Sequence, residues 1–92
     1  MAKKSFFDTK TVKCDDGVPI RLSYYFLREN EGLCNSYGAL VEMERGSNWE
    51  SAAVGKITTS AQKMEKLLEL LCRNSVTPCT LREVVLEEMN KF

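Results

Sequence analysis

The stretch Ser60–Asn74, SAQKMEKLLELLCRN, decides the fold, because its apolar residues recur with the period of an α-helix. At about 100° per residue, one arc of this helix collects its apolar side chains, which are Ala61, Met64, Leu67, Leu68, Leu71 and Cys72. Thr59 with Gln62 matches a capping box, and Ser60 is a competing N-cap. An isolated helix of this length is only marginally stable, so the apolar arc must pack against the rest of the chain.

Leu70 does not belong to this arc, because it projects towards the polar side of the helix. A single exposed leucine is ordinary in a soluble protein. The alternative is that Leu70 belongs to a second contact surface, either against another chain or against the flank of a second helix.

Four segments before this helix alternate in hydrophobicity as β-strands do, and turn residues separate them. The predicted strands are Ser5–Lys13, Ile20–Glu29, Ser36–Arg45 and Trp49–Thr58. The predicted turns cover residues 14–17, 30–32 and 46–48, with residues 33–35 extending the second turn into a longer loop. Gly55 inside the last strand indicates a bulge.

The segment Ile20–Glu29 is the most strand-like run in the chain. One face of this strand should contribute to the core through Ile20, Leu22, Tyr24 and Phe26. The other face is polar at its ends but apolar at Tyr25 and Leu27. A strand that is apolar on both faces at its centre is typically a central strand of its sheet.

The chain closes with a second helix, predicted from Thr80 to about Lys91. Thr77 before Pro78 is one possible N-cap, and Thr80 with Glu83 is another. The order is therefore ββββαα, which predicts one small α+β domain over residues 1–92. We expect a two-layer sandwich, an antiparallel four-stranded meander with both helices packed on one face.

Three segments of the carboxy-terminal half carry a family resemblance: VGKITTS at residues 54–60, NSVTP at 74–78 and LREVV at 81–85. With the leucine-rich helix between them, the chain resembles a family of short bacterial proteins catalogued as a domain of unknown function. The resemblance implies a small, stand-alone cytosolic protein. It supplies no activity, ligand or catalytic residue.

Composition argues against several classes of function without excluding a local basic patch. Thirteen basic residues balance thirteen acidic ones, so bulk charge attracts neither nucleic acid nor anionic lipid. No apolar run is long enough for a membrane span or a signal peptide, which leads us to expect a cytoplasmic protein with reduced thiols. The four cysteines form no C-x-x-C pair and the chain has no histidine, so we expect neither a metal site nor a cofactor.

No catalytic pattern stands out, and we predict that the protein is not an enzyme. Without histidine there is no conventional Ser-His or Cys-His pair, and no glycine-rich nucleotide loop follows any strand. A thiol redox sensor at Cys79 is one alternative, because a helix N-terminus stabilises a thiolate. A weak binder of single-stranded nucleic acid is another, with Tyr25 stacking on bases and Arg21 and Arg28 contacting phosphates.

The preferred interpretation is a protein–protein interaction module, either a homodimer or an adaptor for an unknown partner. It is based on apolar residues in excess of what one thin core requires. These residues are Tyr25 and Leu27 on the outer sheet face, Leu70 on the first helix, and Val84 and Leu86 beside the stripe of the second. The alternative is that the chain buries most of them within itself.

Overall fold

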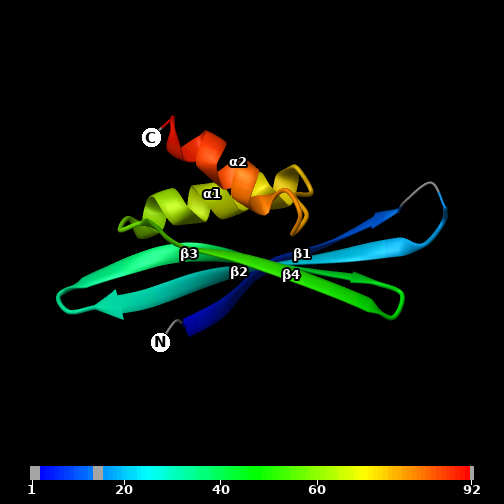
Figure 1. Cartoon of the computed structure of the whole chain (residues 1–92), viewed down its shortest axis with the longest axis horizontal. Coiled ribbons are helices and arrows are strands. Elements are labelled where there is room, and N and C mark those ends of the chain that lie inside the picture. The colour runs from blue at the N-terminus through cyan, green and yellow to red at the C-terminus, as the bar shows by residue number, and fades with distance from the viewer. Residues whose placement is uncertain (1–2, 14–15, 92) are drawn as a thin grey trace.

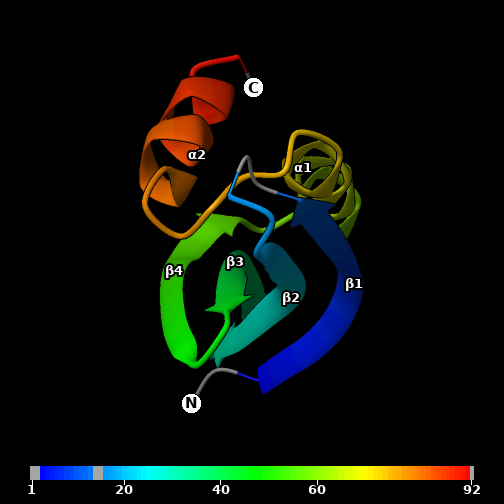
Figure 2. The same ribbon diagram turned by 90° about the vertical axis from the view of Figure 1, so that its right-hand side faces the viewer.

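The predicted ββββαα meander is confirmed by the computed structural model, which describes residues 3–13 and 16–91. The elements are β1 (Lys3–Lys13), β2 (Pro19–Glu31), β3 (Cys34–Arg45), β4 (Asn48–Thr58), α1 (Ala61–Arg73) and α2 (Leu81–Met89). The strands form one antiparallel sheet in the order β1-β2-β3-β4, so the doubly apolar β2 is central as predicted. Both helices lie on the same side of the sheet (Figures 1 and 2).

The β2–β3 connection is tighter than the predicted loop over residues 30–35. Pairing continues to Glu31 and Cys34, so only Gly32 and Leu33 lie between the strands. Gly32 has a φ of 66°, which a two-residue hairpin turn needs at its first central position and which glycine adopts without strain. The prediction of a longer loop was wrong because the Gly-Leu pair alone suffices for the turn. The predicted turn at residues 14–17 lies partly outside the described residues.

The core lies between the helices and the face of the sheet that was predicted to be internal. Leu22 and Tyr24 of β2 are buried, and Ile20 and Phe26 are half-buried against the same cluster. From α1, the core receives the predicted residues Met64, Leu67, Leu68 and Leu71. The Tyr24 hydroxyl donates a hydrogen bond of 2.9 Å to the Val76 carbonyl in the α1–α2 connection. This bond ties the centre of the sheet to the segment that positions α2.

Helix α1 has a side-chain cap at its start, whereas the N-cap residue of α2 makes no side-chain capping hydrogen bond. Ser60 is the N-cap of α1, and its hydroxyl accepts a hydrogen bond from the Lys63 amide at 3.3 Å. The competing prediction of a capping box starting at Thr59 was therefore wrong. Helix α2 begins at Leu81 behind Thr80, so the alternative start behind Thr77 was wrong as well. Pro78 is buried, because the segment before α2 packs against the core as a turn.

Two irregularities modify the sheet. The β3–β4 register shifts between Tyr37 and Ala39, opposite the segment that contains Gly55, which confirms the predicted bulge. A Cβ atom on Gly38 would lie only 2.8 Å from the Gly55 Cα, so glycine is required there for close approach of the two backbones. A second bulge interrupts β1 between Phe6 and Asp8.

Candidate interaction surface

The candidate site is the face of the sheet that carries no helix. Strand side chains alternate between faces, so residues paired across the strands share a face. Phe6 of β1 pairs with Tyr25 of β2, Tyr25 with Leu40 of β3, and Leu40 with Ala53 of β4. These four residues form one apolar row across all four strands, which we call the transverse row.

The β1 end of the transverse row is an aromatic pair. The rings of Phe6 and Tyr25 meet edge to face with centroids 5.8 Å apart. The Lys4 ammonium lies 4.4 Å from the Tyr25 ring centroid, which is a cation–π contact. A hydrogen bond to the Glu42 carboxylate raises the pKa of the Tyr25 phenol, with burial and the Glu42 charge as lesser causes. Phe6 itself remains 61% exposed.

Paired charges flank the transverse row on the same face. Lys4 and Glu42 approach to 4.0 Å, and Arg21 and Glu44 approach to 3.9 Å. The Arg21–Glu44 pair joins the neighbouring strands β2 and β3, and the Lys4–Glu42 pair joins β1 and β3. Positive and negative charges therefore lie side by side on this face. This face therefore combines an apolar centre with a rim of both signs of charge.

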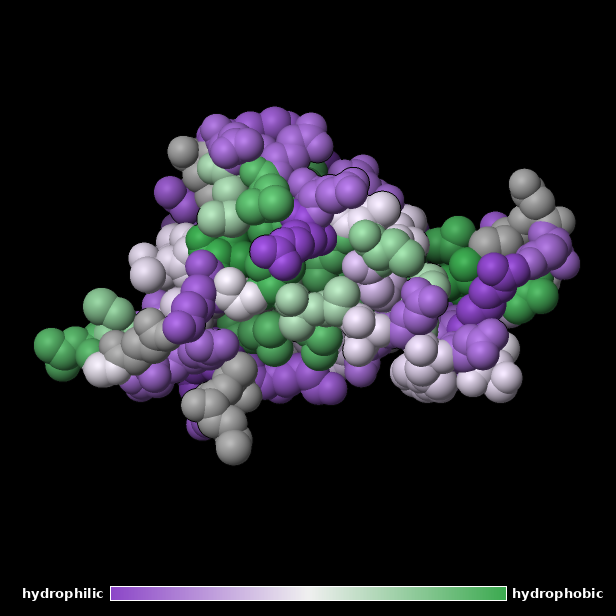
Figure 3. Space-filling model, viewed as in Figure 1, coloured by the Kyte–Doolittle hydropathy of each residue, from purple (hydrophilic) through white to green (hydrophobic). Residues whose placement is uncertain are grey.

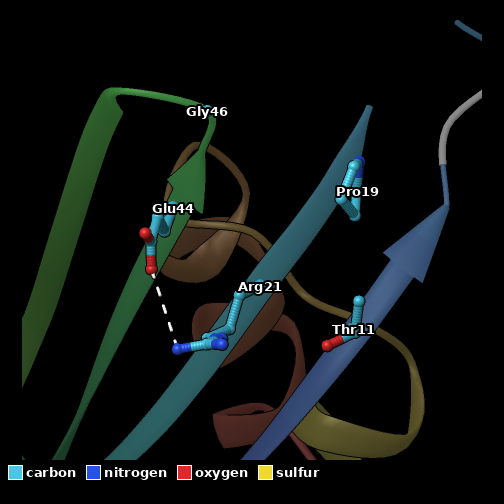
Figure 4. A pocket seen from close by; sticks show the side chains of 5 residues that line it. All are labelled: Thr11, Pro19, Arg21, Glu44 and Gly46. Atoms are coloured by element: carbon cyan, nitrogen blue, oxygen red, sulfur yellow. Dashed lines mark ion pairs between the residues drawn. The ribbon is translucent and has the colours of Figure 1, made fainter. Parts of the chain in front are cut away.

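The Arg21–Glu44 pair also lies in a shallow polar depression of about 200 Å³ at one end of the sheet (Figure 4). Thr11, Pro19 and Gly46 complete its lining. The cationic and anionic groups already satisfy each other there. The depression thus offers no group with unmet charge to a small ligand.

The structure places the five predicted interface residues in three different settings. Tyr25 and Leu27 are half-buried on the helix-free face, as their alternation suggested. Leu70 and Val84 are half-buried against the protein's own core, so the chain itself covers much of both. Leu86 is 53% exposed on α2. The predicted set is therefore not one continuous surface.

The structure does not bring together the three residues of the nucleic-acid hypothesis. Arg21 and Tyr25 share the helix-free face. Arg28 projects from the other face, because it is separated from both of these residues by an odd number of positions along β2. Arg21 already pairs with Glu44. Glu42 and Glu44 add negative charge beside the aromatic ring, which disfavours phosphate.

Cys79 is exposed and lies two residues before the first residue of α2. Its sulfur is 3.9 Å from the Glu50 carboxylate. The redox role stays a prediction.

Sequence reasoning missed Phe6, Leu40 and Trp49 as members of the helix-free face. Trp49 is 64% exposed and pairs with Glu44. The two adjacent phenylalanines of β1 were a usable signal, because strict alternation cannot place both on the core face. Phe7 accordingly packs against the core. The β1 bulge, which shifts the register with β2 between Phe6 and Asp8, is not visible in a hydropathy pattern.

The described residues also lack a metal-binding group and a membrane-spanning helix. Within residues 3–13 and 16–91, no group of three or more Cys, Asp or Glu side chains is arranged to hold a metal ion. Over the same residues, neither helix has the length and hydropathy required to cross a membrane.

Comparison with known protein families gives a match over almost the whole chain. A model of a family of unknown function (DUF6514) matches residues 3–91. The match includes the strands as well as the carboxy-terminal half on which the resemblance was first noted. No curated protein and no solved structure matches the chain.

Proposed function

Because the chain belongs to the DUF6514 family, whose function is unknown, we propose its role from the surface alone: it is a non-catalytic protein–protein interaction module. In this proposal a partner protein binds the helix-free face of the sheet. The cytosol is the proposed compartment, and the free thiols of Cys34, Cys72 and Cys79 are compatible with its reducing conditions.

The transverse row carries the proposal. Phe6 is mostly exposed at one end of the row. Neither helix lies on this face of the sheet (Figures 1 and 2). An apolar, aromatic centre with a charged rim is the usual composition of a protein interface. A partner with an apolar patch flanked by charges of both signs fits this surface best.

In this proposal the charged groups of the face orient the bound partner. Lys4 and Arg21 are each already paired with a glutamate, so their charges fix the orientation of a partner more than they add affinity. Tyr25 is the expected hot spot, because it is central, half-buried and held by Phe6 and Lys4.

A quantitative pull-down with two matched variants tests this function. Phe6→Ser removes an exposed aromatic side chain from the face, and Leu33→Ser removes a still more exposed apolar one from the tip of the β2–β3 hairpin. A protein retained by the wild type and by L33S but lost with F6S supports the proposal. With that partner purified, F6S should weaken binding by about tenfold or more.

Equal retention by all three proteins contradicts the proposal, and so does the recovery of no partner by any of them. Thermal unfolding of each variant provides the control for folding. Phe6 is exposed, so F6S should unfold within a few degrees of the wild type.

A further inference from the structure

An open groove lies between helix α2 and the edge strand β4, on the helix side of the sheet, and its volume is about 380 Å³. Its apolar walls are Val54 and Ile57 of the strand and Leu86 and Met89 of the helix. Figure 3 shows the corresponding hydrophobic surface between α2 and the strands. Leu86 is 53% and Met89 is 37% exposed, so the wall formed by α2 faces solvent.

A bulge in β4 shapes the floor of this groove. Ala39 pairs with Val54 and Tyr37 pairs with Thr58, so residues 55–57 lie outside the regular β3–β4 ladder. Lys56 has a φ of 53° within this bulge. A bulged edge is a poor template for a further strand. An occupant of the groove is therefore held by side chains and not by strand pairing.

The charges in the groove are positive. Lys56 and Arg82 line it, and no acidic residue is part of its lining. Lys56 has an interaction of its own, which leaves Arg82 as the available cation. Arg82 is exposed and makes no ion pair within residues 3–13 and 16–91. Residues three and four positions away share its side of the helix and are uncharged: Pro78, Cys79, Val85 and Leu86.

Two carboxylates lie near this region without neutralising Arg82. Glu50 contacts the Cys79 sulfur at 3.9 Å, and the Glu29 carboxylate lies 3.3 Å from the position that a Cβ on Gly55 would take. Neither carboxylate lines the groove or forms an ion pair with Arg82. The groove thus combines apolar walls with one unpaired guanidinium.

We propose that this groove binds an aliphatic monocarboxylate, with its carboxylate on Arg82 and its hydrocarbon chain along Leu86 and Met89. A guanidinium binds a carboxylate through two parallel hydrogen bonds. Burial of the methylene groups against the apolar walls supplies the remaining affinity. The site goes beyond the proposed function, because it lies on the helix side of the sheet and shares no side chain with the aromatic pair of the transverse row.

The dimensions of the groove select the length of the chain. Arg82, Leu86 and Met89 are at positions i, i+4 and i+7, so they form one row along α2. Seven helical residues rise by about 10 Å. With carbon–carbon bonds of about 1.5 Å, an extended chain advances about 1.3 Å per carbon, so about eight carbons span this row. The volume also lies within the range of about 300–1,000 Å³ that is typical of small-molecule sites.

The first test titrates the protein with sodium octanoate and follows the backbone amide shifts by NMR. Saturable shifts should be confined to residues 53–57 and 82–89, with a Kd below about 1 mM. Octylamine, which has the same chain length and the opposite charge, should bind several-fold more weakly. The absence of saturable octanoate shifts at these residues overturns the proposal, and so does equal binding of octylamine.

Chain length tests the position of the hydrocarbon. Octanoate buries two more methylene groups than hexanoate, so it should bind several-fold and up to about tenfold more tightly. Decanoate extends beyond the row on α2, so it should gain less than about twofold over octanoate. An affinity that rises equally at both steps indicates association with any apolar surface and overturns the assignment.

Matched variants test the role of the guanidinium. Arg82→Gln should lower the affinity for octanoate by about fivefold at low salt and by less at high salt. Arg73→Gln, the same change at an exposed arginine at the end of α1, should bind like the wild type. Leu86→Ser should weaken binding at every salt concentration. Arg82 and Leu86 are exposed, so thermal unfolding should show all variants folded. An R82Q protein that binds like R73Q overturns the proposal.

These outcomes are distinguishable from those of the partner experiment. F6S should bind octanoate like the wild type, and R82Q should retain a partner of the helix-free face. A protein that is lost with L86S but retained by F6S, in the absence of saturable octanoate binding, would assign the groove to a protein partner and overturn the carboxylate site.

Discussion

The buried hydrogen bond from Tyr24 to Val76 gives the sharpest prediction for stability. Tyr24→Phe removes one oxygen atom and leaves the ring in place, so it creates no cavity of consequence. The Val76 carbonyl then loses its donor in a part of the core where Tyr24 is 0% and Val76 is 6% exposed. A buried acceptor left without a partner costs about 1–3 kcal/mol.

In a domain of this size each kcal/mol corresponds to about 4–8 °C, so Y24F should lower Tm by about 5–20 °C. Urea unfolding should give the same loss of free energy with an unchanged slope. Tyr37→Phe is the matched control. The Tyr37 ring packs beside Phe26 with centroids 5.1 Å apart. Its hydroxyl makes no hydrogen bond within residues 3–13 and 16–91. Its effect should stay within about 0.5 kcal/mol.

The pH dependence of the same variant tests the burial of the phenol. Burial, with a smaller contribution from Cys72, raises the pKa of Tyr24 above its value of about 10 in the unfolded chain. Above about pH 10 the folded state therefore binds more protons than the unfolded state, and stability falls as pH rises. The raised pKa values of Tyr25 and Cys72 act in the same direction and persist in Y24F.

The free-energy difference between wild type and Y24F should therefore narrow from about pH 9 to pH 11, because only the wild type loses the Tyr24 contribution. A difference that stays constant over this range would refute the reasoning. So would equal stability of Y24F and Y37F at neutral pH.

Two further variants probe contacts that join distant parts of the chain. Gly38→Ala would place a Cβ against the Val54 carbonyl and the Gly55 Cα, so it should lower the free energy of unfolding in urea by about 2–3 kcal/mol. Gly55→Ala is the control, because its Cβ would meet only the flexible Glu29 carboxylate at 3.3 Å. An equal loss of stability in both variants would contradict the explanation. Lys10→Met removes the ammonium that donates to the carbonyls of Cys72 and Arg73 at 3.3 and 3.1 Å, at the C-terminal end of α1. This substitution should lower the free energy of unfolding by about 0.5–1 kcal/mol at low salt and by less at high salt. An unchanged free energy of unfolding at low salt would count against a capping role for Lys10.

The periodicity of the sequence was sufficient to predict the elements and their core faces. Met64, Leu67, Leu68 and Leu71 are buried because they repeat with the period of a helix, and Leu22 and Tyr24 because they repeat with that of a strand. The order of the strands followed from short turns, since consecutive strands joined by tight turns become neighbours. These properties depend on residues close together in the chain, so a single sequence contains the information.

The sequence alone also determined that surplus apolar residues exist, but only the tertiary structure decided which of them remain uncovered. Leu70 and Val84 are partly covered by the chain's own core, whereas Leu86 and Phe6 stay exposed. The transverse row depends on the strand register and on the β1 bulge. Register, bulges and edges arise from pairing between residues far apart in the chain, so local periodicity cannot specify them.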